Sequence, residues 1–116
     1  MKAETVRSSK AKRSLRRGRR APQAGAAEAE ALAELFRTFA NATRARLLLE
    51  LAGGEKRLSE LAEAVGLSVS AVSHHLQGLR LARVVRRQRV GRSVFYRLDD
   101  EHVESLLKAG LEHVRH

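Results

Sequence analysis

The 116-residue sequence contains no cysteine. This absence excludes disulfide bonds, thiolate metal sites and thiol-based redox sensing. No apolar run approaches the ~20 residues that a membrane-spanning helix requires, so we expect no membrane partner. The sequence also lacks the apolar segment that follows the basic start of a secretory signal peptide, and we expect no such leader.

Motifs typical of enzymes are missing as well. The sequence has no nucleophile elbow and no glycine-rich phosphate loop. A chain of this length also leaves little material to build a substrate pocket. We therefore expect no enzymatic activity and no small-molecule substrate.

Positive charge is concentrated near the N-terminus. The chain carries 23 Lys and Arg against 13 Asp and Glu, a formal net charge of +10. Residues 1–26 hold nine basic residues and one Glu, a net of +8, whereas residues 27–116 hold fourteen basic and twelve acidic residues, a net of +2. Because residues 1–26 offer few large apolar side chains, we expect a disordered basic tail there. One folded domain is expected over residues 27–116.

Three roles of this basic tail remain open. Its lysine and arginine residues could bind polyanions such as DNA or RNA, because binding releases the counterions of the nucleic acid. A passive solubilising tail would have the same composition. The Arg- and Ser-rich, acid-poor composition also permits an organelle transit peptide.

Apolar side chains recur at helical spacing in several segments after residue 27. In the first segment they form an i, i+3, i+4, i+7 stripe on an alanine-rich background. Asn41 and Ser68 are N-cap candidates for the second and fourth segments, and Gly53-Gly54 ends the second. The expected helices cover residues 27–40, 42–52, 58–64, 69–81 and 99–115.

The order of these segments predicts a fold class. The third and fourth helices flank a short turn at Val65-Gly66-Leu67, which is typical of a helix-turn-helix. Two segments of alternating apolar and polar residues, 83–88 and 93–98, then flank a turn in which Gly91 supplies the conformation. Such a hairpin is called a wing. The sequence therefore predicts a mainly α winged helix-turn-helix with five helices and a small β-hairpin.

A winged helix-turn-helix commonly reads double-stranded DNA with the first residues of its second helix, placed in the major groove. Hydroxyl, imidazole and valine side chains can meet base edges or phosphates there, and wing arginines can meet phosphates or the minor groove. The expected contacts are Val69, Ser70, Val72, Ser73, His74, Arg86, Arg87, Arg89 and Arg92. The arginines alone also fit an ordinary solvated hairpin. His75, on the side of Leu76 and Leu79, is expected to face the core instead.

The last seventeen residues contain Asp100-x-His102, ten further residues, and His113-x-x-His116. Carboxylate and neutral imidazole are ligands that tetrahedral zinc takes. Both pairs lie on one helix face, but at ~1.5 Å per residue they are roughly 16 Å apart, so one helix cannot close the site. Two antiparallel copies can, with two identical sites in a symmetric homodimer. Alternatively, Asp99 or Asp100 only caps the helix and the histidines face solvent.

Four segments after Leu35 are distinctive: FANATRARLL (39–48), LSELA (58–62), SAVSHHLQGL (70–79) and VGRSVFYRL (90–98). On these segments, the sequence from Leu35 to the C-terminus resembles the ArsR/SmtB family of metalloregulatory repressors. The third segment fits the family pattern S-x-x-S-x-H-L-x-x-L. In the first segment Ala42 departs from the family, because many members have proline at that helix start.

This resemblance implies a cytoplasmic, nucleoid-associated bacterial repressor. It also implies a homodimer that forms through the first and last helices. This homodimer is expected to dissociate from operator DNA when metal binds. The family's zinc and cobalt sensors place their ligands in the pattern D-x-H-x10-H-x2-[E/H], which Asp100, His102, His113 and His116 match. In the family a ligand histidine relays toward the reading helices, and His113 is the matching residue.

The resemblance also indicates which metal ion the site would bind. The family's thiol site is absent here, because the matching positions are Arg57 and Ser59. Nickel sensors usually recruit further ligands, often an N-terminal histidine, and no histidine precedes His74. A four-coordinate Zn²⁺ is therefore favoured, with Co²⁺ possible and Ni²⁺ less favoured. The competing function is a metal-independent or nonspecific DNA-binding protein with a vestigial metal site.

Overall fold

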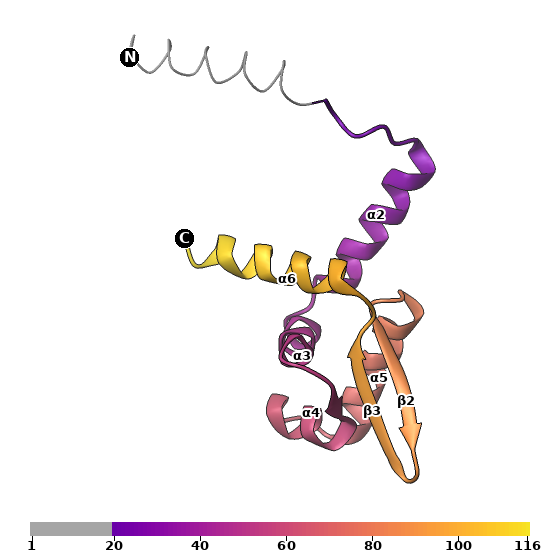
Figure 1. The fold of residues 1–116 in the computed structure, drawn as a ribbon, viewed down its shortest axis with the longest axis vertical. Coiled ribbons are helices and arrows are strands. Elements are labelled where there is room, and N and C mark those ends of the chain that lie inside the picture. The colour runs from indigo at the N-terminus through magenta and orange to yellow at the C-terminus, as the bar shows by residue number, and fades with distance from the viewer. Residues whose placement is uncertain (1–19) are drawn as a thin grey trace. The chain divides into compact units, whose positions relative to one another are not determined.

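The computed structural model describes residues 20–116. Residues 31–116 form one compact unit, which contains every site discussed below. The predicted tail, residues 1–26, lies largely outside the described residues. The elements of the described part are α2 (Ala26–Phe39), α3 (Ala42–Ala52), β1 (Lys56–Arg57), α4 (Leu58–Val65), α5 (Val69–Leu81), β2 (Val85–Val90), β3 (Ser93–Leu98) and α6 (Glu101–Val114) (Figure 1).

Local sequence signals set the ends of the helices. The Asn41 side chain accepts a hydrogen bond from the Arg44 amide at 3.0 Å, and Ser68 Oγ accepts from the Ala71 amide at 3.1 Å. Gly66 ends α4 with a φ of +70°, a left-handed conformation that glycine adopts without a β-carbon clash. The predicted caps at Asn41 and Ser68 and the predicted range of α5 are therefore confirmed.

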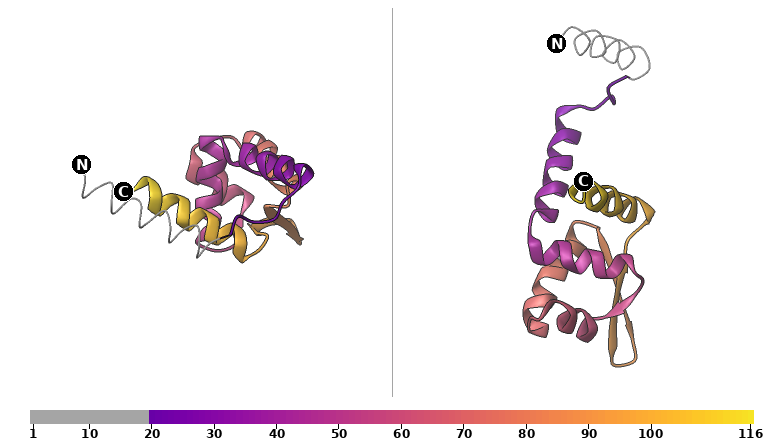
Figure 2. Two further views of the ribbon diagram at one scale, coloured as in Figure 1. Left: turned by 90° about the horizontal axis from the view of Figure 1, so that it is seen from above. Right: turned by 90° about the vertical axis from the view of Figure 1, so that its left-hand side faces the viewer.

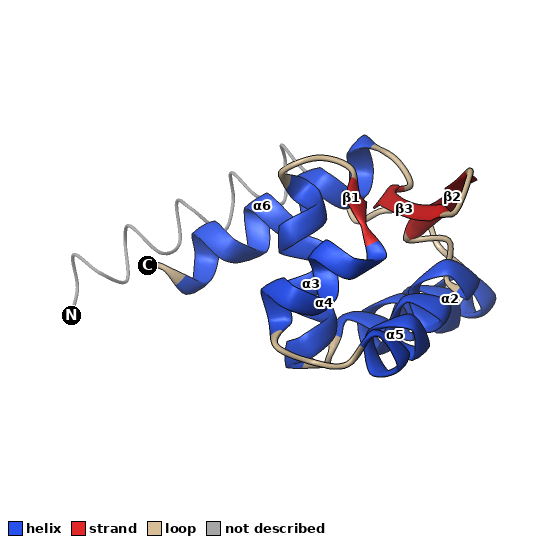
Figure 3. Ribbon diagram, turned by 90° about the horizontal axis from the view of Figure 1, so that it is seen from below, coloured by secondary structure: helices blue, strands red, loops and turns tan. Residues whose placement is uncertain are grey.

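The sheet contains one strand that the sequence did not predict. Lys56 and Arg57 pair antiparallel with Tyr96 and Phe95, which gives the strand order β1-β3-β2 (Figure 3). A two-residue strand is too short to show alternation, so no periodicity could reveal it. The wing also begins later than predicted, because Arg83 leaves α5 with a φ of +60° and pairing starts only at Val85.

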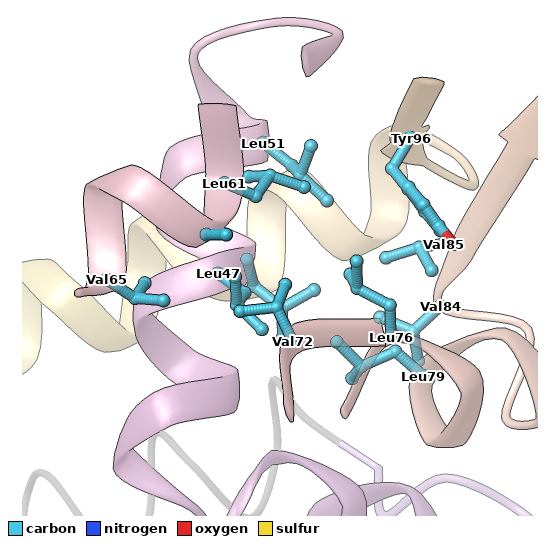
Figure 4. Packing of buried hydrophobic residues seen from close by; sticks show 12 residues of the cluster. Leu47, Leu51, Leu61, Val65, Val72, Leu76, Leu79, Val84, Val85 and Tyr96 are labelled. Carbon is cyan, nitrogen blue, oxygen red and sulfur yellow. The ribbon is translucent and has the colours of Figure 1, made fainter. Parts of the chain in front are cut away.

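The core lies where α3, α4 and α5 meet the base of the wing (Figure 4). Leucine and valine dominate it, and Tyr96 of β3 closes its wing side. The buried residues are Leu47, Leu48, Leu51, Leu61, Ala62, Val65, Val72, Leu76, Leu79, Val84, Val85 and Tyr96. This core holds the helix-turn-helix and the wing in a fixed relation.

Helices α2 and α6 have no fully buried residue. Val103 and Leu107 pack against the edge of the core, but Leu106 is 37% exposed and Val114 is 75% exposed. Leu106 and Val114 are apolar side chains that therefore do not pack inward within one chain. No helix in the described part is long and apolar enough to cross a membrane.

The wing extends away from α6. In Figure 1 and the right-hand view of Figure 2, the turn between β2 and β3 lies at the far end of the hairpin from α6. Helix α4 lies on the same side as this turn. The predicted DNA-reading elements and the predicted metal ligands therefore occupy different sides of the compact unit.

Candidate nucleic-acid interface and metal half-sites

The first turns of α5 present exposed side chains. Val69 is 50% exposed, and Ser70 and His74 are also exposed, whereas Ser73 is half-buried. Val72 is 0% exposed, because its spacing from Leu76 places it on the core face of α5. The prediction that Val72 contacts DNA is therefore wrong.

The wing arginines divide into two groups. Arg87, Arg89 and Arg92 are exposed along the hairpin and at its turn. Arg86 lies at the base of the wing, where its Nε donates to Asp99 Oδ1 at 2.6 Å. This hydrogen bond to the Asp99 carboxylate raises the pKa of Arg86. Arg86 is thus an exposed neighbour of Arg87, but unlike the other three arginines it is engaged by a carboxylate within the described residues.

His75 is half-buried against α3 rather than fully inside the core. Arg44 Nε donates a hydrogen bond to His75 Nδ1 at 3.3 Å. Burial lowers the pKa of His75, and the positive charges of Arg44 and His74 lower it further. Gly78 leaves room for this contact, since a Cβ there would come within 2.7 Å of Arg44 Nη2.

Asp100 and His102 form the first half of the predicted metal site. Asp100 Oδ1 caps α6 by accepting from the His102 amide at 2.9 Å and the Val103 amide at 3.1 Å. Asp100 Oδ2 lies 3.5 Å from His102 Nδ1, and the His102 side chain is 97% exposed. The backbone hydrogen bond from Val103 is the main cause that lowers the pKa of Asp100. One carboxylate can therefore cap the helix and still offer its other oxygen to an ion.

His113 and His116 form the second half, at the other end of α6. They line a surface hollow together with Ala109 and Glu112. Within the described residues of one chain, no group of three or more His, Asp or Glu could hold an ion. Each half-site nevertheless offers oxygen or imidazole donors of the kind zinc takes, so the residues fit the ion only when two half-sites meet.

Two residues near these sites had no clear signal in the sequence. Glu112 adds a carboxylate to the hollow of His113 and His116, but it reads as an ordinary exposed helix residue. Arg57 lies with its guanidinium carbon 5.8 Å from the centre of the Phe95 ring. The pairing of β1 with β3 brings the side chains of Arg57 and Phe95 together. The sequence shows only that a basic residue, Arg57, precedes a helix, and this does not predict the contact.

A helix-turn-helix formed by α4 and α5, followed by an arginine-rich antiparallel hairpin, defines a winged helix-turn-helix protein. Residues 41–87 match the model of the bacterial regulatory protein, arsR family. Over 88 residues the chain is 42% identical to the transcriptional repressor SmtB homolog of Synechocystis sp., covering 76% of this chain and 67% of that protein. The chain belongs to the ArsR family.

Two further comparisons agree with this assignment. The chain is 50% identical over 74 residues to the HTH-type transcriptional regulator KmtR of Mycobacterium tuberculosis, covering 64% of this chain and 57% of that protein. It therefore matches little more than half of that relative's length. A solution structure of a homodimeric winged helix-turn-helix DNA-binding domain from Mycobacterium bovis, a possible ArsR-family regulator, aligns with a TM-score of 0.71 and 31% identity. That alignment covers 83% of this chain and 90% of the other, and it confirms the predicted fold.

Proposed function

We propose that the chain is a metal-responsive transcriptional repressor that binds operator DNA as a homodimer and releases it when zinc binds between the last helices. One observation carries this proposal. Two donor pairs, Asp100 with His102 and His113 with His116, occupy opposite ends of a helix whose apolar residues are not fully buried within the chain. A second copy would cover those residues and complete both ion sites.

An apolar groove supports the dimer. Residues of α2, α3 and α6 line it, and the large exposed side chain of Phe36 contributes to it. Its lining residues are Phe36, Phe39, Ala45, Leu49, Leu106, Leu107, Gly110, Leu111 and Val114. Contiguous exposed apolar surface of this kind marks an interaction site. Antiparallel packing of two α6 helices would bury it.

The same packing would bring the donor pairs together. The Asp100–His102 pair of one chain would lie against the His113–His116 pair of the second, and two-fold symmetry would repeat the arrangement. When bound, zinc would supply a positively charged cross-link between the two chains. Cobalt would suit the same donors, and nickel, which prefers more ligands, less so.

Operator binding would use the opposite side of the unit. The first turns of α5 would enter the major groove, and wing arginines would contact phosphates or the minor groove. The buried Val72 and the paired Arg86 leave the proposed contact set. It then consists of Val69, Ser70, Ser73, His74, Arg87, Arg89 and Arg92.

The chain connects these two sides directly. Strand β3 of the wing ends at Leu98, and Asp100 caps the next helix. The dimer held by zinc would adopt a geometry in which the two reading helices no longer fit successive half-sites on DNA. Metal and operator would then oppose each other through one shared coupling free energy.

Cobalt titration of the purified protein, with and without an operator duplex, tests this function. We expect intense tetrahedral absorption that saturates at one metal per chain, together with weaker operator binding. Absence of metal binding would contradict the sensor. A metal-independent binder would instead show steep salt dependence, little sequence preference and no response to zinc.

A further inference from the structure

A small hollow lies beside the first residue of α5, between that helix and the wing. Its lining combines two arginines, two serines and three apolar side chains. These residues are Arg57, Leu58, Ser59, Val69, Arg92, Ser93 and Val94. Two separate segments, residues 57–59 and 92–94, therefore bring hydrogen-bond donors to one place next to the DNA-reading helix.

Arg57 is held in position at this hollow. Its backbone pairs with Phe95 in the sheet, and its guanidinium carbon lies 5.8 Å from the centre of the Phe95 ring. A guanidinium that contacts an aromatic face keeps its N–H edge available for an acceptor. The Arg57 side chain is thus partly ordered before any ligand arrives.

The positive charge at the hollow is not neutralised by the chain. In the described part of the chain, neither Arg57 nor Arg92 takes part in a salt bridge. Glu60 is close in sequence, but its Oε1 accepts from the Arg57 backbone amide at 2.8 Å. Guanidinium groups only donate hydrogen bonds, and serine hydroxyls can donate as well. This combination suits an anion with several oxygen acceptors.

The position of the hollow identifies the anion. Val69 lines the hollow, is 50% exposed and begins the helix proposed to enter the major groove. The edges of that groove are the phosphate backbones of the duplex, so a helix inserted by its first turn brings phosphates beside it. We propose that the hollow binds a backbone phosphate of the DNA, with Arg57 and Arg92 supplying charge and Ser59 a hydroxyl. This inference rests on the proposed function, because it assumes that α5 enters the groove.

Such a contact would position the reading helix rather than read the bases. Phosphate contacts set the register of a protein on DNA without reporting the sequence directly. Arg57 and Ser59 would therefore contribute equally to operator and random-sequence duplex. Together with Arg92 they would hold α5 and the wing on the same strand.

The salt dependence of DNA affinity tests this proposal. The 116-residue chain and its Arg57→Gln, Arg57→Lys and Arg80→Gln variants would be titrated with two duplexes, one selected by the chain from a random library and one of random sequence. Loss of one phosphate contact lowers the slope of log K against log salt by about 0.9. We expect this change on both duplexes for Arg57→Gln. Arg57→Lys keeps the charge and should keep the slope.

Arg80→Gln is the matched control, because Arg80 is an exposed arginine in the last turn of α5 and does not line the hollow. It should leave the slope unchanged. Ser59→Asp is a second variant, which keeps the Arg57–Phe95 contact and places a carboxylate in the hollow. It should weaken binding to both duplexes more than Arg80→Gln does.

The outcomes separate the two proposals. A wild-type slope in Arg57→Gln, together with wild-type affinity in Ser59→Asp, would overturn the phosphate site even if zinc regulation is intact. A reduced slope without any zinc response would support the phosphate site and contradict the metal sensor. Failure of the wild-type chain to bind either duplex would overturn both. Thermal unfolding of each variant establishes that the compared proteins are folded.

Discussion

At the scale of single residues, Asp100 caps α6, and this cap is compatible with the proposed role of Asp100 as a metal ligand. One carboxylate oxygen accepts two backbone hydrogen bonds at the start of α6, and the other lies 3.5 Å from His102 Nδ1. A helix cap and a metal ligand need the same property, an oxygen acceptor at a fixed place. The capping geometry therefore orders the carboxylate for the proposed ion.

Substitution of Asp100 can separate these two roles. Asparagine caps helices about as well as aspartate, whereas alanine does not. We expect Asp100→Asn to keep the urea unfolding midpoint of the metal-free protein, and Asp100→Ala to lower it. Both should weaken zinc binding by more than ~10-fold, because even residues that only orient ligands contribute 10–100-fold. Wild-type zinc affinity in Asp100→Asn, measured by competition with a chelator, would contradict the ligand role.

His75 gives a prediction about pH. Its pKa is lowered in the folded chain by burial and by Arg44 and His74, whereas the unfolded chain takes up a proton near the ordinary pKa of ~6.5. The unfolded state then binds more protons below that pH, so the free energy of unfolding should fall as pH is lowered. Glutamine can still accept from Arg44 but does not titrate.

We therefore expect metal-free His75→Gln to lose less stability than wild type between pH 7.5 and pH 5.5. Urea unfolding at both pH values measures the difference. The other four histidines are the same in both proteins, so the comparison isolates His75. Equal losses in the two proteins would show that the His75–Arg44 contact does not couple protonation to folding.

At the scale of elements, α6 is amphipathic, but only part of its apolar face packs against the rest of the chain. Val103 and Leu107 touch the core, whereas Leu106 and Val114 are exposed beside the apolar groove. The α5 helix behaves differently, because Val72, Leu76 and Leu79 are all fully buried. Helical spacing predicted both helices, but it placed Val72 among the DNA contacts and could not tell which neighbour covers each apolar face.

Leu106→Glu tests the face of α6. The side chain is exposed in one chain, so the fold should survive, but a charge in the groove should prevent the second copy from packing. We expect monomers by sedimentation, an unchanged far-UV circular dichroism spectrum, and weak zinc binding because the half-sites no longer meet. Gln77→Glu, at an exposed position outside the groove, is the control and should remain dimeric. Tight zinc binding by monomeric Leu106→Glu would contradict the shared site.

At the scale of the whole molecule, regulation requires that two distant surfaces respond to each other. The proposed DNA contacts lie on α5 and the wing, whereas the donor pairs lie on α6. In the proposed repressor, linkage requires zinc to weaken operator binding by the same factor by which operator weakens zinc binding. This equality follows from the thermodynamic cycle that joins zinc binding and operator binding. It does not depend on which residues transmit the coupling.

His113→Ala probes that route. His113 matches the family's relay histidine, so the resemblance implies a relay role for it. The structure places His113 in the hollow shared with Glu112 and His116. We expect the variant to retain measurable metal binding but to lose most of the zinc-induced release of operator. Fluorescence anisotropy of a labelled duplex, with and without zinc, gives the coupling factor. Release by zinc as in wild type would contradict the relay.

Much of the fold followed from local patterns in the sequence. Helical spacing, the caps at Asn41 and Ser68, and the glycine of the turn at Gly66 depend on neighbouring residues only. The spacing between Asp100 and His116 likewise showed that one helix could not close an ion site. Absence of cysteine excluded thiolate ligands without any structure.

Other features depended on contacts between distant segments. The burial of Val72, the pairing of Arg86 with Asp99, and the placement of Arg57 on Phe95 each join or bury groups far apart in the chain. Periodicity describes one element at a time and carries no information about which elements meet. The sequence by itself therefore determined the helices, the turn and the donor spacing. Only tertiary packing decided which side chains are free to contact DNA, because burial and ion pairing remove some candidates and bring in others.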